Sequence, residues 1–576
     1  MRGSIAWMAE LQDVTPERIA ADAAATVLDY HRRTRHRFDA YALGPSALDW
    51  DAQPAPFRHF DGAPSIALPL VADGKQHRAL APLLNRPFGA PAPFAAAIGL
   101  SAIGALLNLA LGITAWKTLG PDRWAVRANP SSGNLHPIEA YVIAVGIGDL
   151  ADGIYHYDPL QHTLSQRAKF GSHSLAQGSL FVGLTSVMWR ETWKYGERAF
   201  RYCALDCGHA MSALAYAAKV LNWSVCERRD ITSESLAALL GIDRALDFPG
   251  RPATEREEAE VLLQFGCSGA RLPGTAQQLM DAVAESQWFG RASAIDRFPM
   301  FRWPIVEHVA EATRRSEPQP PQSLDWLAPI TAGRVDERAC SDVILQRRSA
   351  LRFDTTYRMP WHSFRALLGG LLPEGHGSRI TLVFFVQRVD GLLPGIYFLP
   401  RGDLQRVQFF SALHDAVGSS HVADLPGLYP LVKTIVDVQA FKRLLRSLHC
   451  HQDIASGACF AVGMLAPLDA AVTADPASYR DLLREAGAIG QSLYLHAEVL
   501  GLRGTGVGCY FDEPVLDTLE LNFNSRDLNA HEINAREINS RDAAGSGYQS
   551  LYHFTIGLPL PDPRMATAPP YPERTG

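Results

Sequence analysis

Two alanine-rich apolar segments in different halves of the chain align without gaps. They read CGHAMSALAYAAKVLNW from Cys207 and AGAIGQSLYLHAEVLGL from Ala486, and the alignment matches Gly208 with Gly487. Apolar residues recur in both at helical spacing. Because alanine favours helices and small side chains let helices approach closely, we expect each segment to form a helix buried between two repeats.

Two further pairs of segments occur in both halves. DGIYHYD from Asp152 is similar to PGIYFLP from Pro394, and RRTRHRF from Arg32 has the spacing of RRSALRF from Arg347. The three pairs follow the same order along the chain. This order indicates an internal duplication.

The chain has 576 residues, which is too long for one hydrophobic core. Proline and glutamine cluster in RRSEPQPPQSLDWLAP, which begins at Arg314 and interrupts the apolar periodicity. We therefore predict a first repeat with an N-terminal extension over 1–313, a linker over 314–335 and a second repeat over 336–576.

Strand-like apolar runs flank the two helical segments without strict βαβ alternation. The runs begin at Ala140, Leu180, Ile380 and Gly457. The sequence therefore predicts an α+β fold. A polar segment from Asn524 to Asp542 repeats Asn-Ser-Arg-Asp and Glu-Ile-Asn and is interpreted as an exposed insertion, with a partner-binding arm as the alternative.

Composition argues against several classes of protein. The net charge is −6 and no long basic run occurs, which argues against nucleic acid as a partner. The long apolar stretch from Phe94 contains glycines and Asn108, which favours a buried helix over a membrane span. The N-terminus lacks the apolar core of a signal peptide, and the eight cysteines lack paired zinc-site spacing. We expect a cytoplasmic protein without a metal site.

The segment NPSSGNLHPIEAY from Asn129 places small polar residues directly before an apolar run. Pro-Ser-Ser-Gly-Asn is good turn chemistry by itself. Small residues with free backbone N–H groups also suit the close approach of a flat ligand with polar edges. The spacing alone favours the turn.

RRSALRF places Arg347, Arg348 and Arg352 close to Ser349, which the pattern predicts at the start of a helix. Guanidinium groups and a hydroxyl suit a phosphate. The alternative is a basic first helical turn with a serine cap.

Two more segments contain residues of possible chemical use. GLRGTGVGCYFD from Gly501 lacks the dinucleotide fingerprint, and it is either a loop between helix and strand or a backbone surface that a ring can approach. WRETWKYGERAFRY from Trp189 places Lys194 beside Tyr195, where a lysine of lowered pKa can act as a base. Taken alone, this second segment favours an amphipathic helix with solvated charges.

In combination, these motifs resemble the nitroreductase-like flavoproteins. The combination of PSSGNLHP with KYGERAFRY resembles their branch of azoline dehydrogenases of the SagB/ThcOx type, which oxidise thiazoline and oxazoline rings in ribosomal peptides. The resemblance covers nearly the whole chain as a tandem pair. It implies an α+β fold whose two repeats form an intramolecular pseudo-dimer with FMN at their interface.

The resemblance also implies site residues. The Arg-Arg-Ser motif and a C-terminal basic residue hold the phosphate, the Pro-Ser-Ser-x-Asn loop comes from the other repeat, and the Lys-Tyr pair removes a proton. The catalytic residues implied are Lys194 and Tyr195. The cofactor-binding residues implied are Arg347, Arg348, Ser349, Arg352, Pro130, Ser131, Ser132, Asn134, Gly506, Gly508 and Arg564.

Each repeat departs from the family pattern where the other keeps it. The second repeat has no PSSGN, and the first has NWSVCERRD where the second has GLRGTGVGC. We therefore expect one complete composite FMN site and one degenerate site. Because the Arg32 motif could hold a second phosphate, two bound FMN molecules per chain remain an alternative. The favoured function is an FMN-dependent dehydrogenase acting on a small molecule or peptide. The alternatives are a nicotinamide-dependent nitro- or quinone reductase and a flavin-free scaffold or peptide-binding module.

Overall fold

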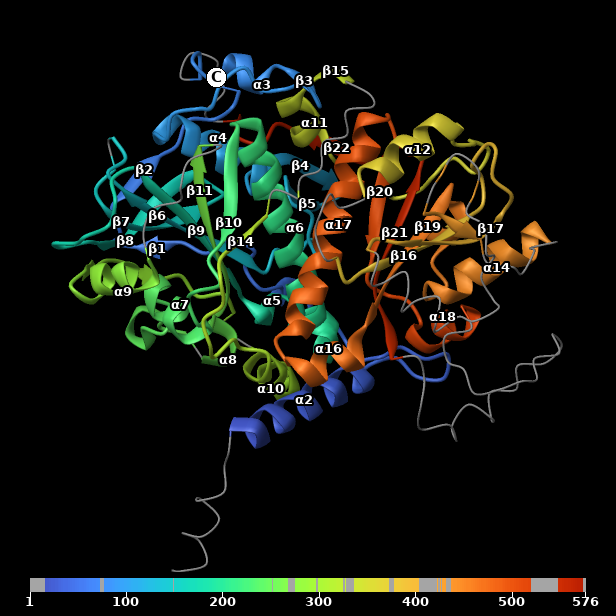
Figure 1. Cartoon of the computed structure of the whole chain (residues 1–576), viewed down its shortest axis with the longest axis horizontal. Coiled ribbons are helices and arrows are strands. Elements are labelled where there is room, and N and C mark those ends of the chain that lie inside the picture. The colour runs from blue at the N-terminus through green and yellow to red at the C-terminus, as the bar shows by residue number, and fades with distance from the viewer. Residues whose placement is uncertain are drawn as a thin grey trace, which may run out of the picture.

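The computed structural model contains two large antiparallel sheets, one built from each half of the chain (Figure 1). It describes residues 16–72, 77–148, 150–250, 252–267, 275–296, 299–324, 327, 336–371, 378–402, 422, 425, 427–430, 437–519 and 547–572. The predicted insertion from Asn524 to Asp542 therefore lies outside the described residues. The mixture of helices and antiparallel strands agrees with the predicted α+β class.

The two sheets share the order of their five central strands. The first runs β12-β8-β7-β6-β9-β11-β10-β14 with β2 beside β8, and the second runs β18-β17-β16-β19-β21-β20. The strands of the first sheet are β2 (Ser65–Ala67), β6 (Ile138–Val145), β7 (Gly153–Asp158), β8 (Thr163–Lys169), β9 (Ser179–Ser186), β10 (Trp223–Glu227), β11 (Glu258–Cys267), β12 (Gln287–Trp288) and β14 (Gln322–Ser323). The strands of the second are β16 (Thr381–Val386), β17 (Gly395–Pro400), β18 (Tyr429–Pro430), β19 (Phe460–Pro467), β20 (Arg503–Val507) and β21 (Tyr548–Gly557).

The four apolar runs predicted as strands are β6, β9, β16 and β19, so these predictions are confirmed. Every residue of β6 is buried because both faces of the sheet are covered. Successive side chains of a strand point to opposite faces. Accordingly, Val142 belongs to the hydrophobic cluster that includes the central helix, whereas Ile143 belongs to a different cluster on the other face.

Two long helices, α6 (Ala199–Val220) and α17 (Ser478–Val499), pack against each other between the sheets (Figure 1). They contain the aligned segments of the sequence, and the predicted helices are confirmed. A Cβ atom on Gly208 would lie 2.0 Å from the Arg484 carbonyl oxygen, and one on Gly487 would lie 2.0 Å from that of Leu205. The two matched glycines therefore permit backbone contact where the helices meet.

The other helices pack around the two sheets and the central pair. They are α2 (Pro16–Arg33), α3 (Ala81–Leu84), α4 (Leu100–Ala110), α5 (Met188–Tyr195), α7 (Ser233–Leu240), α8 (Pro252–Glu255), α9 (Ala276–Ala284), α10 (Pro304–Ala312), α11 (Cys340–Gln346), α12 (Trp361–Gly369), α14 (Val438–Leu448), α15 (Asp453–Gly457), α16 (Leu468–Ala474) and α18 (Asp512–Thr518). Of these, α4 and α11 share a hydrophobic cluster with α6. The apolar stretch after Phe94 forms α4, which is buried against the first sheet and α6. No described helix has both the length and the apolarity that a membrane crossing needs.

Both ends of the described chain pack on the opposite half. Val27 and Tyr30 of α2 belong to the hydrophobic cluster around the second sheet. Near the C-terminus, β22 (Ala566–Ala568) pairs with β4 (Ile113–Leu119), which also pairs with β5 (Asp122–Arg127). Two short pairs complete the strands: β1 (Phe60–Asp61) with β13 (Arg291–Ala292), and β3 (Pro87–Phe88) with β15 (Asp336–Ala339).

Replacing Gly208 by alanine should destabilise the chain, because the new methyl group would collide with the backbone of α17. We expect the free energy of unfolding to fall by about 1–3 kcal/mol, the usual cost of overpacking. Urea denaturation followed by circular dichroism measures this change. Gly457→Ala in α15 is the matched control, because its Cβ would lie 3.9 Å from the nearest atom. A loss in the control as large as in Gly208→Ala would contradict the argument.

Candidate active site

The Pro-Ser-Ser-Gly-Asn segment forms a tight loop between β5 and β6. Gly133, Asn134 and His136 all have left-handed backbones, with φ of 59°, 60° and 54°. The Asn134 side chain donates to the Ala125 carbonyl at 2.9 Å, and the Ser131 hydroxyl accepts the N–H of His136 at 2.8 Å. The turn interpretation is therefore confirmed, and these two side chains brace the loop.

Ser132 connects the loop to the central helix α6. Its backbone N–H donates to both carboxylate oxygens of Asp206 at 3.1 Å, and its hydroxyl donates to one of them at 2.9 Å. Burial outweighs these hydrogen bonds and raises the pKa of Asp206 to about 7. The loop is therefore fixed to a carboxyl group that changes charge near neutral pH.

Lys194 and Tyr195, at the C-terminal end of α5, lie over Gly133 of the loop. A Cβ on Gly133 would lie 2.6 Å from the Tyr195 hydroxyl and 3.1 Å from Lys194 Nζ. Burial lowers the pKa of Lys194 and raises the pKa of Tyr195 well above its usual value. The lysine is therefore the better candidate base, and the tyrosine remains a phenol that can donate a hydrogen bond.

The Arg-Arg-Ser motif of the second half reaches the loop of the first. Arg347 donates from Nε to the Ala128 carbonyl at 2.9 Å and from Nη2 to the Arg127 carbonyl at 3.0 Å, directly before the loop. Arg348 donates to the Thr114 carbonyl of β4 at 3.0 Å. Residues predicted from opposite halves thus lie side by side.

Ser349 does not begin a helix, so that prediction is wrong. Helix α11 ends at Gln346, and Ser349 instead forms an isolated parallel bridge with Gly504. Its hydroxyl lies 2.9 Å from the Tyr494 hydroxyl, which also accepts the N–H of Gly506 at 3.0 Å. The serine is positioned by α17 and β20 rather than by a cap.

Four cationic side chains gather beside the loop. Burial and the charges of Arg347 and Arg503 lower the pKa of Arg348 to about 10. The pKa of Lys117 is also lowered by burial and by Arg348 and Arg503. Glu498 is the carboxylate that faces this group, 3.7 Å from Arg503 Nε.

One donor in this group lacks a partner. Nη1 of the buried Arg347 makes no hydrogen bond within the part of the chain that the structure describes. The excess of guanidinium and ammonium groups suits an anion such as a phosphate monoester. The donor set therefore fits the phosphate of FMN.

The glycine-rich segment is an edge strand rather than a loop. Gly506 lies in β20, and Gly508 follows it directly. A Cβ on Gly506 would lie 1.8 Å from the Tyr552 hydroxyl oxygen, and one on Gly508 would lie 2.2 Å from the ring of Tyr202. These glycines let tyrosine side chains from both halves approach the strand.

Of the three remaining predicted residues, Arg352 and Arg564 make no contact with these groups among the interactions described. Arg564 is 76% exposed and pairs with Asp562 at 2.8 Å. Arg352 is also exposed, and its backbone carbonyl accepts the N–H of Leu560 at 2.9 Å. Pro130 is half-buried at the start of the loop. The structure therefore does not bring Arg352 and Arg564 together with Arg347.

The charges around Lys194 are not the solvated surface of an amphipathic helix, so that interpretation is wrong. Arg198 and Arg201 are buried and pair with Asp512 of the second half at 3.1 and 2.9 Å. Glu191 is also buried, and neither of its carboxylate oxygens has a hydrogen-bond partner among the described residues. Burial and the nearby Asp206 raise the pKa of Glu191 well above its usual value.

Sequence reasoning missed five residues of this site: Lys117, Glu191, Asp206, Tyr494 and Arg503. Only Asp206 has a signal in the sequence, because the alignment of α6 with α17 matches it with another acid, Glu485. Glu191 lies three residues before Lys194 in α5, but its burial is not evident from the sequence. Lys117, Tyr494 and Arg503 meet the site through contacts between distant segments, which the sequence does not reveal.

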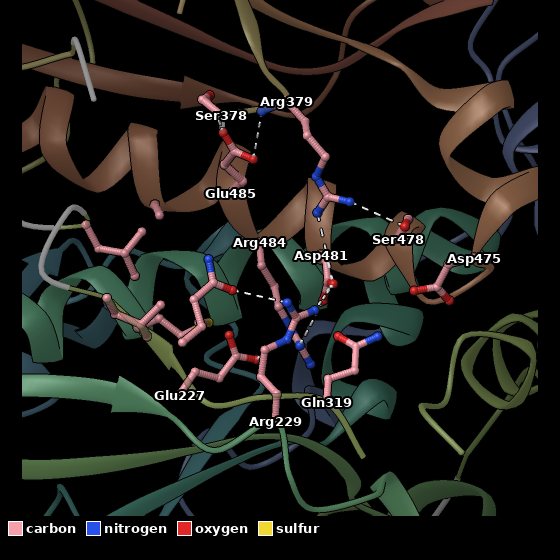
Figure 2. Close-up of a pocket in the computed structure, with 15 residues that line it drawn as sticks. Glu227, Arg229, Gln319, Ser378, Arg379, Asp475, Ser478, Asp481, Arg484 and Glu485 are labelled. Carbon is pink, nitrogen blue, oxygen red and sulfur yellow. Dashed lines mark hydrogen bonds and ion pairs between the residues drawn. The ribbon is translucent and has the colours of Figure 1, made fainter. Parts of the chain in front are cut away.

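A polar cavity of about 390 Å³ lies against α17 where that helix faces β10 (Figure 2). Within it, Ser378 donates to Glu485 at 2.5 Å, and Arg229 donates to Asp481 at 2.7 Å. The cavity is lined by Met211, Glu227, Arg229, Gln319, Gln322, Leu324, Leu327, Ser378, Arg379, Asp475, Ser478, Asp481, Arg484, Glu485 and Ala488.

The Arg32 motif, which sequence reasoning assigned to a second phosphate, is absent from this lining. Arg32 is exposed and pairs with Asp29 at 3.1 Å, and Arg33 pairs with Glu197. Both arginines are therefore engaged in ion pairs elsewhere.

Comparison with known proteins places part of this site in a known family. Residues 95–249, which include the loop, Lys194 and Asp206, match the nitroreductase family. A "putative nitroreductase" from Methanocaldococcus jannaschii is 28% identical over 115 residues, 18% of this chain and 54% of that protein. The chain thus spans about half the length of this curated relative.

Solved structures extend the likeness in fold to both halves. The crystal structure of a "putative nitroreductase" from Anabaena variabilis superposes with a TM-score of 0.62 at 20% identity, covering 93% of this chain and 99% of that one. The two chains share a fold. A microcin synthetase complex from Escherichia coli gives a TM-score of 0.26 at 16% identity over 37% of this chain and 69% of that one, too low to bear on the fold.

Asp206→Asn should change how stability depends on pH. The folded state holds the Asp206 proton up to a pKa of about 7, whereas an unfolded aspartate ionises near 4. The folded state binds more protons between these values, so wild-type stability falls as pH rises through that range. Relative to Asp206→Asn, we expect the free energy of unfolding of the wild type to fall by about 3 kcal/mol between pH 4 and pH 7. Urea titrations of both proteins measure the free energy of unfolding at each pH. A difference between the two proteins that stays constant across this range would refute the prediction.

Proposed function

We propose that this chain is an FMN-dependent oxidoreductase with one flavin site built from both halves. The observation that carries the proposal is the position of Arg347, whose guanidinium contacts the backbone that leads into the Ser131–Asn134 loop of the other half. The nitroreductase-family match over residues 95–249 supports a redox function. FMN would supply reversible hydride acceptance at its N5 atom.

The chain's own residues would divide the work of holding this cofactor. Arg347, Arg348, Arg503 and Lys117 would bind the phosphate as a cationic group. The loop, braced by Asp206 and Ala125, would present its backbone to the ring from the first half. From the second half, β20 would present its backbone to the ring beside Tyr552 and Tyr202, which pack against Gly506 and Gly508.

We further propose that the two halves are duplicated units arranged as a pseudo-dimer, and that the cavity in Figure 2 is the degenerate second site. The alignment of α6 with α17 matches Gly506 with Glu227 and Gly508 with Arg229. The contacts correspond as well: Ser132 with Asp206 on one side, and Ser378 with Glu485 on the other. Charged side chains thus occupy the positions that are glycine in the first site, which argues for one FMN per chain.

The proposed reaction is dehydrogenation of a substrate C–H bond. Lys194 would accept the proton, since burial lowers its pKa toward that of a usable base, and Tyr195 would donate a hydrogen bond to the substrate. The sequence resemblance to azoline dehydrogenases makes a peptide thiazoline or oxazoline the first substrate to test.

Cofactor content tests the site directly. We expect purified protein to be yellow and to contain about one FMN per chain. Arg348→Ala should raise the Kd for FMN about tenfold to a hundredfold, since a charge-assisted hydrogen bond contributes roughly 1.5–3 kcal/mol. Asn134→Ala should also weaken FMN binding, although Asn134 lies in the first half of the chain and Arg348 in the second. Fluorescence titration with FMN measures both.

Arg229→Ala in the cavity of Figure 2 is the matched control and should leave FMN affinity unchanged. A colourless protein that does not take up FMN would favour the flavin-free scaffold. Two FMN per chain would refute the degenerate site.

Lys194→Met tests the assignment of the base. We expect kcat for azoline oxidation to fall about 10²–10⁴-fold, the usual contribution of a general base, with FMN content unchanged. Steady-state kinetics with a synthetic azoline peptide measures this. Rapid NADPH oxidation with a nitroaromatic acceptor, equal in wild type and variant, would instead support the nitroreductase alternative.

A further inference from the structure

Two cysteine thiols from distant segments meet directly beside the glycine-rich strand. Cys509 follows Gly508, and Cys450 lies in the turn between α14 and α15. Each thiol has the largest influence on the pKa of the other, and both are half-buried free thiols. The Phe511 N–H donates to the Leu448 carbonyl at 2.9 Å, which keeps the two segments adjacent.

The turn that presents Cys450 has an unusual backbone. Cys450 and His451 both lie in the left-handed region, with φ of 52° and 60°. Non-glycine residues adopt this conformation uncommonly, and such positions tend to persist at functional sites. The turn is fixed in part by the Gln452 side chain, which donates to the Cys509 carbonyl at 3.4 Å.

His36 of the N-terminal segment also influences the Cys509 thiol. Its Nδ1 accepts the N–H of Ala42 at 3.0 Å, which leaves the Nε2 proton as the ring's donor. The hydrogen bond from Cys450 and then that from His36 lower the pKa of Cys509 to about 5, against the opposing effect of burial. The Cys450 pKa is raised, so the two thiols are unequal. Other titratable groups facing the pair are Arg198, Asp512, Tyr41, Tyr195 and Tyr202.

We propose that Cys450 and Cys509 form a redox-active dithiol that reduces small disulfides. Cys509, as the thiolate, attacks one sulfur of the disulfide, breaks its S–S bond and releases one thiol after that product takes up a proton. Cys450 then loses its proton and attacks Cys509 of the mixed disulfide, which releases the second thiol. The protein dithiol is oxidised by two electrons to a Cys450–Cys509 disulfide, and the small disulfide is reduced to two thiols.

The position of the pair connects it to the proposed flavin site. Tyr202 donates to the carbonyl of Gly508, the residue before Cys509, at 3.1 Å. The Tyr202 ring lies 4.5 Å from the ring of Tyr195, measured between centroids. The inference depends on the proposed function only for the electrons that would regenerate the dithiol, since thiol exchange itself needs no flavin.

Anaerobic titration of the reduced full-length chain with 2-hydroxyethyl disulfide tests the proposal. We expect two equivalents of 2-mercaptoethanol to be released and peptide mapping to find a Cys450–Cys509 disulfide. Cys450→Ser should release one equivalent and retain a mixed disulfide on Cys509. Cys509→Ser should leave Cys450 unmodified under the same conditions, and Cys226→Ser, which alters another half-exposed thiol, should behave as wild type.

Alkylation of the unmutated chain gives an independent measurement. At pH 6, iodoacetamide should modify Cys509 about ten times faster than Cys226, because the larger thiolate fraction outweighs the lower nucleophilicity of a low-pKa thiol. Equal rates, or mixed disulfides without an internal one, would overturn the proposal. If the chain binds no FMN but still forms the disulfide, the proposed function fails and the dithiol stands. If it binds FMN without forming the disulfide, the dithiol fails alone.

Discussion

The backbone contact between α6 and α17 at Gly208 and Gly487 is the constraint on which the rest of the structure depends. Each helix packs against the sheet of its own half, so the contact sets the spacing between the halves. Side chains of α6 and α17 then reach both candidate sites. Asp206 and Tyr494 meet the loop and β20, whereas Asp481 and Glu485 line the cavity. A larger residue at the contact would therefore disturb every group that depends on this spacing.

The two sites differ in how they satisfy buried polar groups. In the cavity of Figure 2, Asp481 forms ion pairs with Arg229 at 2.7 Å and with Arg315 at 2.9 Å, so its charge is compensated within the protein. Beside the loop, Glu498 faces several cations, and Arg347 keeps a buried N–H without a partner among the described residues. Buried unpaired donors are costly unless a ligand completes them. Arg229 and Arg484 of the cavity also keep a buried Nε–H without a partner among the described residues, but the carboxylates Glu227, Asp481 and Glu485 balance the cations there. The excess of positive charge beside the loop is therefore the physical reason for placing an anionic cofactor at the loop rather than in the cavity.

Sequence reasoning predicted the helices and strands that are specified by a pattern within their own residues. Continuous apolar runs identified β6 and β16, and periodic small residues identified α6. It failed where tertiary contacts override local preference. Ser349 resembles a helix cap, but Tyr494 and Gly504 hold it in extended structure. The glycine-rich segment resembles a loop because glycine disfavours strands, yet β21 pairs along its length. The contact between the loop and Arg347 was predicted because each repeat lacks the flavin-site motif that the other keeps. The roles of Lys117 and Arg503 became apparent only from the structure.

The buried ion pairs of Asp512 explain why a charged segment of the first half determines the geometry of the second. Arg198 and Arg201 both pair with Asp512, and Arg198 also donates to the Gly508 carbonyl at 2.9 Å. Asp512 in turn accepts the N–H of His36 at 2.9 Å. Because removing one partner of a buried pair leaves an uncompensated charge, this network holds its members in fixed positions. It therefore fixes the end of β20 against α6, and the same contacts place Tyr202, Cys509 and His36 beside one another. The proposed flavin site and the proposed dithiol thus depend on one set of buried charges that spans both halves of the chain.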